Sequence, residues 1–313
     1  MDHDAPMPPP PPPPPTGQDA LAGVGWMLLS GVLFVGVTAM VKSLGTALPA
    51  VEAAFLRYAT GLVFLVPMAG AIMRAGLTRR QGALFAARGA VHTIGVALWF
   101  FAMTRIPIAE VTAMNYLSPV YVTLGAAVLL GERLTRIRVL AVLAGLVGAA
   151  IILRPGFREV EDGHLAMLGT AVAFAASYLI AKQMSGEVSA LVVVAMLSVF
   201  VTIGLAPLAF AVWQPPTGRQ VLVLFGVAAL ATAGHWTMTK AFAAAPVGVT
   251  QPVAFLQLVW ATLLGALFFA EPIDPWVALG GAVIIGAVSL VAWRERRPPP
   301  RALRGTRRFG APP

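Results

Sequence analysis

Ten apolar segments, separated by charged residues, glycine or proline, recur along the whole chain. A helix needs roughly 20 apolar residues to cross the hydrocarbon core of a bilayer, and most of these segments are that long. Only 11% of the residues are charged and 58% are hydrophobic, whereas a soluble domain has about 25% charged residues. The sequence therefore predicts an all-α polytopic membrane protein. We expect its transmembrane helices near residues 20–42, 51–73, 82–104, 107–130, 138–153, 164–184, 189–212, 219–242, 247–269 and 275–293.

One apolar segment is written twice. The stretch PIAEVTAMNYLSPVYVTLGAAVLLGE at 107–132 aligns without gaps with PVGVTQPVAFLQLVWATLLGALFFAE at 246–271, so that Leu117 matches Leu256 and Glu132 matches Glu271. The repeated unit holds five of the ten expected helices. Because five is odd, the second copy must enter the membrane from the opposite side, which gives the inverted repeats of many secondary transporters.

This duplication divides the chain into four parts. We expect a disordered Pro-rich cytoplasmic arm at 1–19, a first repeat at 20–155, a second repeat at 156–293 and a basic tail at 294–313. The run of prolines in the arm favours an extended polyproline II conformation that cannot pack a core.

Positive charges are distributed unevenly between the connections. With the N-terminus in the cytoplasm, 15 Lys and Arg residues fall inside and 5 outside. The positive-inside rule thus predicts that both termini are cytoplasmic, in a bacterial inner membrane. The net charge of +9 owes much to the tail, which we expect to touch anionic lipid head groups rather than nucleic acid.

Several motifs of enzymes and pumps are missing from the sequence. It has no cysteine, no GxxxxGK[ST] phosphate loop, no G-x-S-x-G and no H-E-x-x-H. We therefore expect no catalytic residues, no metal site, no cofactor and no ATP-driven motor.

Four short motifs carry a family resemblance. They are Glu52-Phe55-Arg57-Tyr58 at the start of the second span, Ala102 with Pro107–Glu110 before the fourth, Pro119–Tyr121 within it, and Glu132–Leu134 after it. Together they resemble the drug/metabolite transporter superfamily in its EamA-type ten-helix branch. The resemblance covers roughly 21–293 and implies a carrier of amino acids, vitamins, nucleotide-linked compounds or other small metabolites.

Polar residues inside the third and eighth spans are candidates for the site, because polar groups in a membrane are costly and often functional. Arg88, His92 and Trp99 share one face of the third span. His92 and His235 are the titratable side chains deep enough to couple transport to protons, and Arg88 is a further charge candidate. A structural role is the alternative for each histidine, and anchoring at the interface is the alternative for Arg88. For Arg57 we expect pairing with Glu52 or Glu110.

The two equivalent spans at 107–130 and 247–269 carry further candidates. They are Thr112, Asn115 and Tyr116 in the first span and Gln251 and Phe255 in the second; Tyr178 in the sixth span is a weaker one. Such hydrogen-bonding groups among aromatic walls are typical of small-molecule sites. Pro119 and Pro252 are expected to break these helices near the site, while Glu132 and Glu271 are expected to cap or bridge helix ends.

The leading functional hypothesis is a secondary carrier that exports amino acids or similar zwitterions through a central cavity by alternating access. Uptake of an aromatic vitamin such as riboflavin, or of a nucleoside-like compound, is the alternative within the class. A channel and a membrane-embedded enzyme are more distant alternatives. Gly145 and Gly148 in the fifth span, and Gly280, Gly281 and Gly286 in the tenth, suggest close helix packing or a homodimer contact.

Overall fold

The computed structural model describes residues 17–74, 76–130, 135–157, 159–184, 187–245, 250 and 253–295. The expected Pro-rich arm up to residue 16, the basic tail from residue 296, and Glu132, Gln251 and Pro252 lie outside the described residues.

The first half of the chain forms five membrane-spanning segments. They are α1 (Gly17–Ser43); the series α2 (Ala50–Gly61), η1 (Leu62–Met68) and α3 (Ala69–Met73); α4 (Arg79–Met103); the pair α5 (Ile108–Asn115) and α6 (Leu117–Leu130); and α7 (Arg136–Leu153). The second segment changes from α-helix to 3-10 helix at Leu62, and Pro67 lies inside the 3-10 helix. Proline has no N–H to donate to the preceding turn, so Pro67 interrupts the α-helical hydrogen bonds of this segment.

The second half forms the other five. They are α8 (Asp162–Gln183), α9 (Ala190–Ala211), α10 (Gly218–Ala244), the segment that ends with α12 (Gln257–Phe269), and α13 (Pro275–Glu295). In the segment that ends with α12, the preceding residues Thr250, Val253 and Ala254 are also helical. Judged by length and composition alone, seven of the described helices are long and apolar enough to cross a membrane. The remaining segments are the two broken ones and α13. The protein is therefore an all-α polytopic membrane protein with ten spans, as the apolar pattern predicts.

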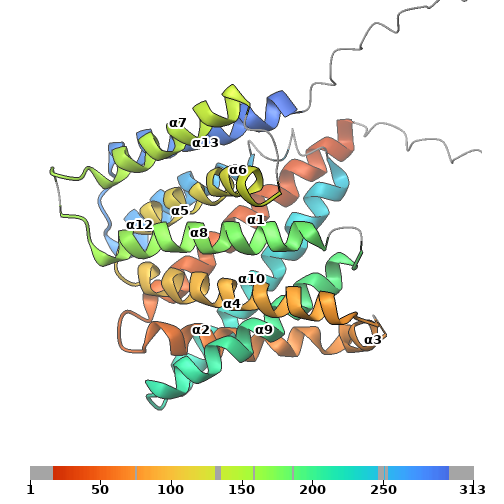
Figure 1. Ribbon diagram of the computed structural model, residues 1–313. Helices are drawn as coiled ribbons and strands as arrows, with labels where there is room; N and C mark the ends of the chain where they lie inside the picture. Colours follow the sequence, from red (N-terminus) through yellow and green to blue (C-terminus); the bar gives the residue numbers. More distant parts are fainter. Residues whose placement is uncertain are drawn as a thin grey trace, which may run out of the picture.

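The two halves thread the bundle in opposite senses. In Figure 1, α1 begins and α13 ends on the right, and we call this side the terminal face. The α1–α2, α4–α5, α7–α8 and α9–α10 connections lie on the left, the opposite face. Helix α1 thus runs away from the terminal face, whereas its counterpart α8 runs toward it. This is the inverted five-helix repeat that an odd repeat unit demands.

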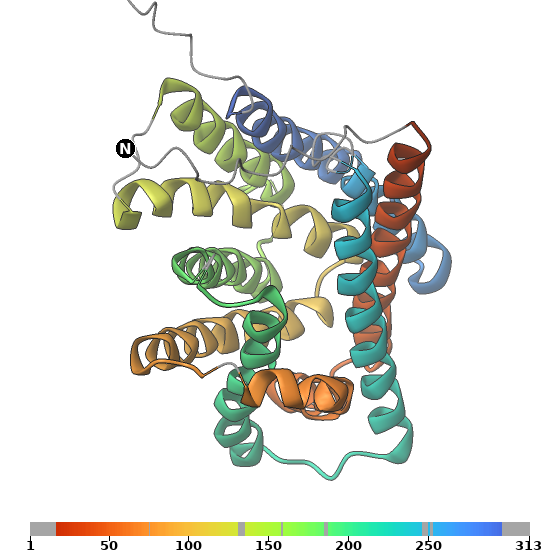
Figure 2. The same ribbon diagram turned by 90° about the vertical axis from the view of Figure 1, so that its right-hand side faces the viewer.

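Packing joins the halves rather than separating them. Helix α1 lies along α10, α4 lies along α8, and α7 lies along α13. Figure 2 shows α1 in red beside α10 in teal, and α7 beside α13 at one edge of the bundle. Each of these pairs combines one helix from each repeat, so the core is shared by both.

The outside of the bundle is apolar. Leu222 is 70% exposed, Val128 is 74% exposed and Leu267 is 78% exposed. Side chains of this kind cannot form the surface of a soluble protein over so many positions. Because the helices are long and apolar, these side chains face lipid.

Both central segments break at equivalent positions. Helix α5 ends at Asn115 and α6 begins at Leu117, while residues 255 and 256 form a turn just before α12. At each break the backbone tightens, because Tyr116 N donates to Ala113 O at 3.2 Å and Leu258 N donates to Phe255 O at 3.1 Å. Tyr116 and Phe255 are themselves equivalent in the duplicated sequence, so the break is a property of the repeat.

Candidate functional site

Arg88 and His92 of α4 meet on one hydroxyl of α8. The Arg88 Nε donates to Ser177 Oγ at 3.4 Å, and His92 Nδ1 lies 3.1 Å from the same oxygen. Arg88 Nη1 also donates to the carbonyl oxygen of Val193 in α9, at 3.0 Å. The three residues Arg88, His92 and Ser177 are buried. Arg88 thus ties α4 to two helices of the other repeat.

Aromatic rings surround this polar group. The His92 ring stacks on Phe174 at 4.7 Å with an interplanar angle of 23°. Trp99, two turns further along α4, meets the edge of Phe174 at 6.1 Å. Its indole Nε1 is buried without a hydrogen-bond partner among the described residues. A buried N–H without a partner costs free energy, so it is a ready donor for a ligand.

Tyr178 follows Ser177 on α8 and is 47% exposed. Its ring lies 6.4 Å from Phe174, and its hydroxyl is close enough to Tyr58 and Arg88 to interact electrostatically. Tyr178 therefore lies within electrostatic range of residues on α2 and α4.

Arg57 of α2 does not pair with either expected carboxylate. Glu52 accepts a hydrogen bond from Gln214 N at 2.9 Å, and Glu110 pairs with His164. The Arg57 guanidinium instead lies 4.0 Å above the ring of Tyr58. Five residues correspond to about 140° around an α-helix, so Glu52 and Arg57 point in different directions.

His235 of α10 completes a group of cationic and titratable side chains. It is exposed, and its ring meets Phe34 of α1 at 5.0 Å, edge to face. Arg57 and His92 both lie within electrostatic range of it. Side chains from α1, α2, α4, α8 and α10 therefore converge on one region between the repeats, which we call the cationic cluster: Arg57, Arg88, His92 and His235.

The cationic cluster has no carboxylate beside it within the described ranges. Every described Asp and Glu lies in a connection or in the first or last turn of a helix. The central region is consequently positive, and it favours ligands with acceptor groups over ligands with a positive charge.

The candidates of the broken segments form a second group. Tyr116 meets Phe255 edge to face at 5.5 Å, and its hydroxyl donates to Ala254 O at 3.5 Å. Asn115 Oδ1 is buried without a partner among the described residues, whereas Thr112 donates to Ile108 O at 2.9 Å. No ring contact or hydrogen bond within the described chain joins this group to the cationic cluster.

The helix break itself has a clear cause in the first repeat only. Pro119 lacks the N–H that would bond to Asn115 O, which places the break at Tyr116. In the second repeat Leu258 stands where Pro119 stands in the first. Pro252 precedes the break at Phe255, and its own placement lies outside the described residues.

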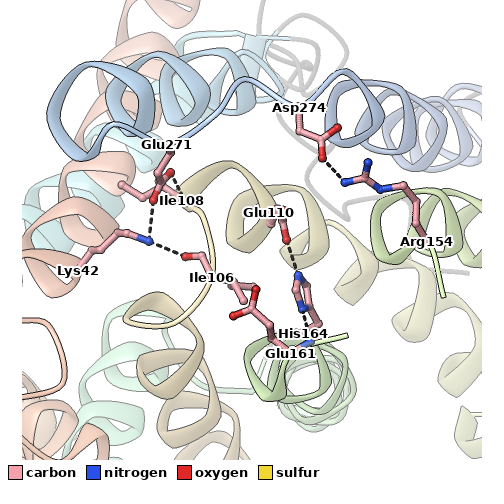
Figure 3. Close-up of polar contacts among 9 residues, drawn as sticks. All are labelled: Lys42, Ile106, Ile108, Glu110, Arg154, Glu161, His164, Glu271 and Asp274. Atoms are coloured by element: carbon pink, nitrogen blue, oxygen red, sulfur yellow. Dashed lines mark hydrogen bonds and ion pairs between the residues drawn. The ribbon is translucent and has the colours of Figure 1, made fainter. Parts of the chain in front are cut away.

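The opposite face is held by buried ion pairs (Figure 3). Lys42 Nζ lies 2.6 Å from Glu271 Oε1 and donates to Ile106 O at 2.7 Å. Glu271 Oε2 accepts from the backbone N–H of Ile108, the first residue of α5, at 2.8 Å. A carboxylate at a helix N-terminus is favourable for the helix dipole. Glu271 therefore bridges α1, α5 and the end of α12.

Two further pairs lie to the right of the Lys42–Glu271 pair in the same view. Arg154, at the end of α7, pairs with Asp274 just before α13. Glu110 pairs with His164 at the start of α8, and both side chains are almost fully buried. His164 Nδ1 accepts from Glu161 N at 3.0 Å, so the proton on the ring resides on Nε2 and is donated to Glu110. Sequence reasoning missed His164, whose ring takes the position that Glu or Gln usually has in a capping box at the start of a helix.

The terminal face carries an exposed pair. Arg80 Nη1 lies 3.0 Å from Glu187 Oε1, and Gln81 Nε2 donates to Glu187 Oε2 at 3.3 Å. These hydrogen bonds, that from Arg80 first, lower the pKa of Glu187 below its usual 4.5.

Four of the five expected glycines pack within the chain, whereas a Cβ on Gly286 would meet nothing within 4 Å. A Cβ on Gly148 would lie 2.7 Å from Gly280 O, and a Cβ on Gly280 would lie 2.5 Å from Gly148 O. Gly145 and Gly281 are similarly close to Val120 and Leu258. Gly148 and Gly280 allow α7 and α13 to approach closely, and the homodimer stays a prediction.

Comparison with known proteins agrees with this architecture. The model of the EamA-like transporter family matches residues 21–154 and again 162–293. A riboflavin transporter of Vibrio cholerae is 30% identical over 283 residues, which cover 88% of this chain and 95% of the relative. A riboflavin transporter of Rhizobium johnstonii is 31% identical, covering 89% and 93%. An S-adenosylmethionine uptake transporter of Rickettsia felis is 24% identical, covering 88% and 94%.

A solved crystal structure has the same fold. It superposes with a TM-score of 0.57 at 22% identity and covers 90% of this chain and 99% of that one.

The inverted ten-span bundle and these relatives define a multi-pass membrane transporter of small molecules, not an enzyme. The chain belongs to the EamA-like transporter family, within the drug/metabolite transporter superfamily.

Proposed function

We propose that the protein is a secondary carrier that brings riboflavin, or a closely related flat aromatic compound, into the cell. One observation carries the proposal: two riboflavin transporters are 30% and 31% identical to the chain over nearly its whole length. This favours the uptake alternative of the sequence analysis over export of amino acids.

The chemistry of the central region supports the same choice. Riboflavin offers a planar ring system for stacking and two ring carbonyls that accept hydrogen bonds. The interior provides aromatic rings at Phe174, Trp99 and Tyr178 and donors at Arg57 and at the unpaired Trp99 Nε1. Aromatic walls with a few polar groups are the usual construction of such sites.

Zwitterionic and cationic substrates fit less well. An amino acid carries an ammonium group that needs an acceptor or a carboxylate, and S-adenosylmethionine carries a sulfonium as well as an ammonium. The described carboxylates all lie near the two faces, and two arginines stand in the interior. Burying a cation beside them would be unfavourable.

The mechanism that suits this architecture is alternating access in a bacterial cytoplasmic membrane with both termini inside. The Lys42–Glu271 pair joins the two repeats at the opposite face. Opening that face requires the pair to separate, and the inverted repeat offers an equivalent rearrangement at the terminal face. His92 and His235 are the residues we propose for any proton coupling.

Uptake of radiolabelled riboflavin tests the proposal. The full chain is expressed in a riboflavin-auxotrophic bacterium that lacks its own transporter, with the empty vector as control. We expect saturable uptake that unlabelled riboflavin suppresses and an excess of amino acids does not. Reconstituted vesicles should also show counterflow, which a channel cannot produce. Uptake no greater than the vector control would reject riboflavin as the substrate.

A further inference from the structure

Within the described chain, the guanidinium of Arg57 differs from that of Arg88 in having no hydrogen-bond partner. Arg88 is fixed by Ser177 Oγ and Val193 O. The Arg57 guanidinium makes a contact with the ring of Tyr58 at 4.0 Å, and the described residues supply it with no hydrogen bond or ion pair. A guanidinium has five N–H donors in a rigid fork, so most of its binding capacity is unused.

The unused donors of Arg57 lie close to side chains of both repeats. Arg57 is partly buried and lies on α2, which packs against α4, α9 and α10. It interacts electrostatically with both His92 and His235, which belong to different repeats. The guanidinium therefore lies within electrostatic range of side chains from both repeats.

Holding an unpaired charge inside a membrane bundle costs free energy. Such a cost is recovered when a ligand with acceptor oxygens binds to the charge, because hydrogen bonds to charged groups are about twice as strong as neutral ones. The aromatic rings near it would hold the flat part of the same ligand.

We propose that Arg57 binds the acceptor-rich edge of the substrate and excludes cationic compounds from the site. The ligand class is a planar aromatic that presents carbonyl or anionic oxygens to the guanidinium fork. This inference rests on the proposed function for the choice of a flavin, but the role of Arg57 does not depend on that choice. The ring carbonyls of riboflavin satisfy it, and the added phosphate of flavin mononucleotide offers a second group of the same chemistry.

Binding to the purified full-length protein tests the inference. Quenching of flavin fluorescence measures riboflavin affinity for the wild type, Arg57→Gln, Arg57→Lys and the control Arg105→Gln. Arg105 is exposed near the end of α4 and stacks on Phe101 at 3.5 Å. We expect Arg57→Gln to weaken binding by roughly tenfold or more. Arg57→Lys should bind with intermediate affinity, because it keeps the charge and loses the fork. Arg105→Gln should bind like the wild type.

A ligand-free measurement separates binding from folding. Because the Arg57 guanidinium has no hydrogen-bond or ion-pair partner among the described residues, Arg57→Gln should leave the melting temperature unchanged or raise it. A clear fall in melting temperature would show that Arg57 is structural and would overturn the inference. Equal riboflavin affinity in Arg57→Gln and the wild type would overturn it as well, while leaving the proposed function intact.

A wild type that fails to bind riboflavin still allows the role of Arg57 to be tested. If the wild type does not bind riboflavin, the proposed function falls, and the role of Arg57 is decided by thermal shift with flavin mononucleotide and S-adenosylmethionine. Stabilisation by flavin mononucleotide that disappears in Arg57→Gln upholds the inference. Stabilisation of the wild type by S-adenosylmethionine, or none by flavin mononucleotide, overturns it.

Discussion

Lys42 and Glu271 form an ion pair of 2.6 Å across the two repeats, with only 17% and 10% of their side chains exposed. Lys42 ends α1, and Glu271 follows α12 and also accepts from the first N–H of α5. A Cβ on Gly265 would lie 2.2 Å from Glu271 Oε2, so the glycine leaves room for the carboxylate. One carboxylate thus fixes three segments at the opposite face.

Removing one partner of this pair leaves a largely buried charge alone. We expect Lys42→Met to lower the free energy of unfolding by about 3 kcal/mol, as for other buried pairs. The double variant with Glu271→Gln should lose less than the sum of the single variants, because the two residues interact directly. Thermal unfolding in detergent measures both. Strict additivity would show that the pair is not coupled.

The close approach of α7 and α13 depends on Gly148. A Cβ there would lie 2.7 Å from Gly280 O and 2.6 Å from Ile284 Cγ1, so Gly148→Val should cost about 1–3 kcal/mol or more through overpacking. The matched control is Gly286→Ala on α13, where a Cβ would meet nothing within 4 Å. We expect that control to melt at or slightly above the wild-type temperature. Equal melting of both variants would contradict the packing described.

The Arg80–Glu187 pair predicts a pH effect of defined sign. The pKa of Glu187 is lowered in the folded protein. Its contribution to stability is therefore present above the unfolded value of 4.5 and is lost as the pH falls through the lower folded value. Glu187→Gln should differ from the wild type at neutral pH, and the difference should vanish in acid. Because the pair is exposed, we expect it to be small and to shrink in high salt. A stability difference between Glu187→Gln and the wild type that grows in acid would contradict the lowered pKa of Glu187.

Trp99 is expected to matter for binding more than for folding. Its Nε1 has no partner among the described residues, and Trp99→Phe keeps an aromatic ring beside Phe174. If the indole N–H donates to the substrate, riboflavin affinity should fall severalfold, in the range of one hydrogen bond, without a loss of melting temperature. Unchanged affinity would exclude the N–H as a ligand contact.

The two histidines of the membrane-spanning helices, His92 and His235, give a test of proton coupling. Uptake by the double variant His92→Gln and His235→Gln should lose whatever pH dependence the wild type has, because no described carboxylate lies mid-membrane to replace them. Transport rates in vesicles with and without a pH gradient measure this. Full coupling in the double variant would place the proton pathway elsewhere.

The architecture could be predicted from the sequence because its signals are long and repeated. Apolar runs mark each span, and the alignment of 107–132 with 246–271 fixes the inverted arrangement through an odd helix count. Even the break in the first repeat has a local cause, in Pro119. The break at Phe255 could not be predicted in the same way, because Leu258 occupies the equivalent position.

The polar contacts were harder to predict because they join distant residues. Lys42 and Glu271 are far apart in the chain, and neither local spacing nor the repeat indicates their pairing. The expected pairing of Arg57 with Glu52 or Glu110 is wrong. The depth of a residue in the membrane does not determine the direction in which its side chain points around the helix. Glu52 instead accepts a hydrogen bond from Gln214 N, and Glu110 pairs with His164.

The breaks at Tyr116 and Phe255 give each central segment a joint at the same level, and the two aromatic rings touch there. A joint allows one half of a segment to tilt while the other half stays packed. Under the proposed alternating access, bending of both central segments at this level would open one side of the bundle without sliding whole repeats past each other through the surrounding lipid.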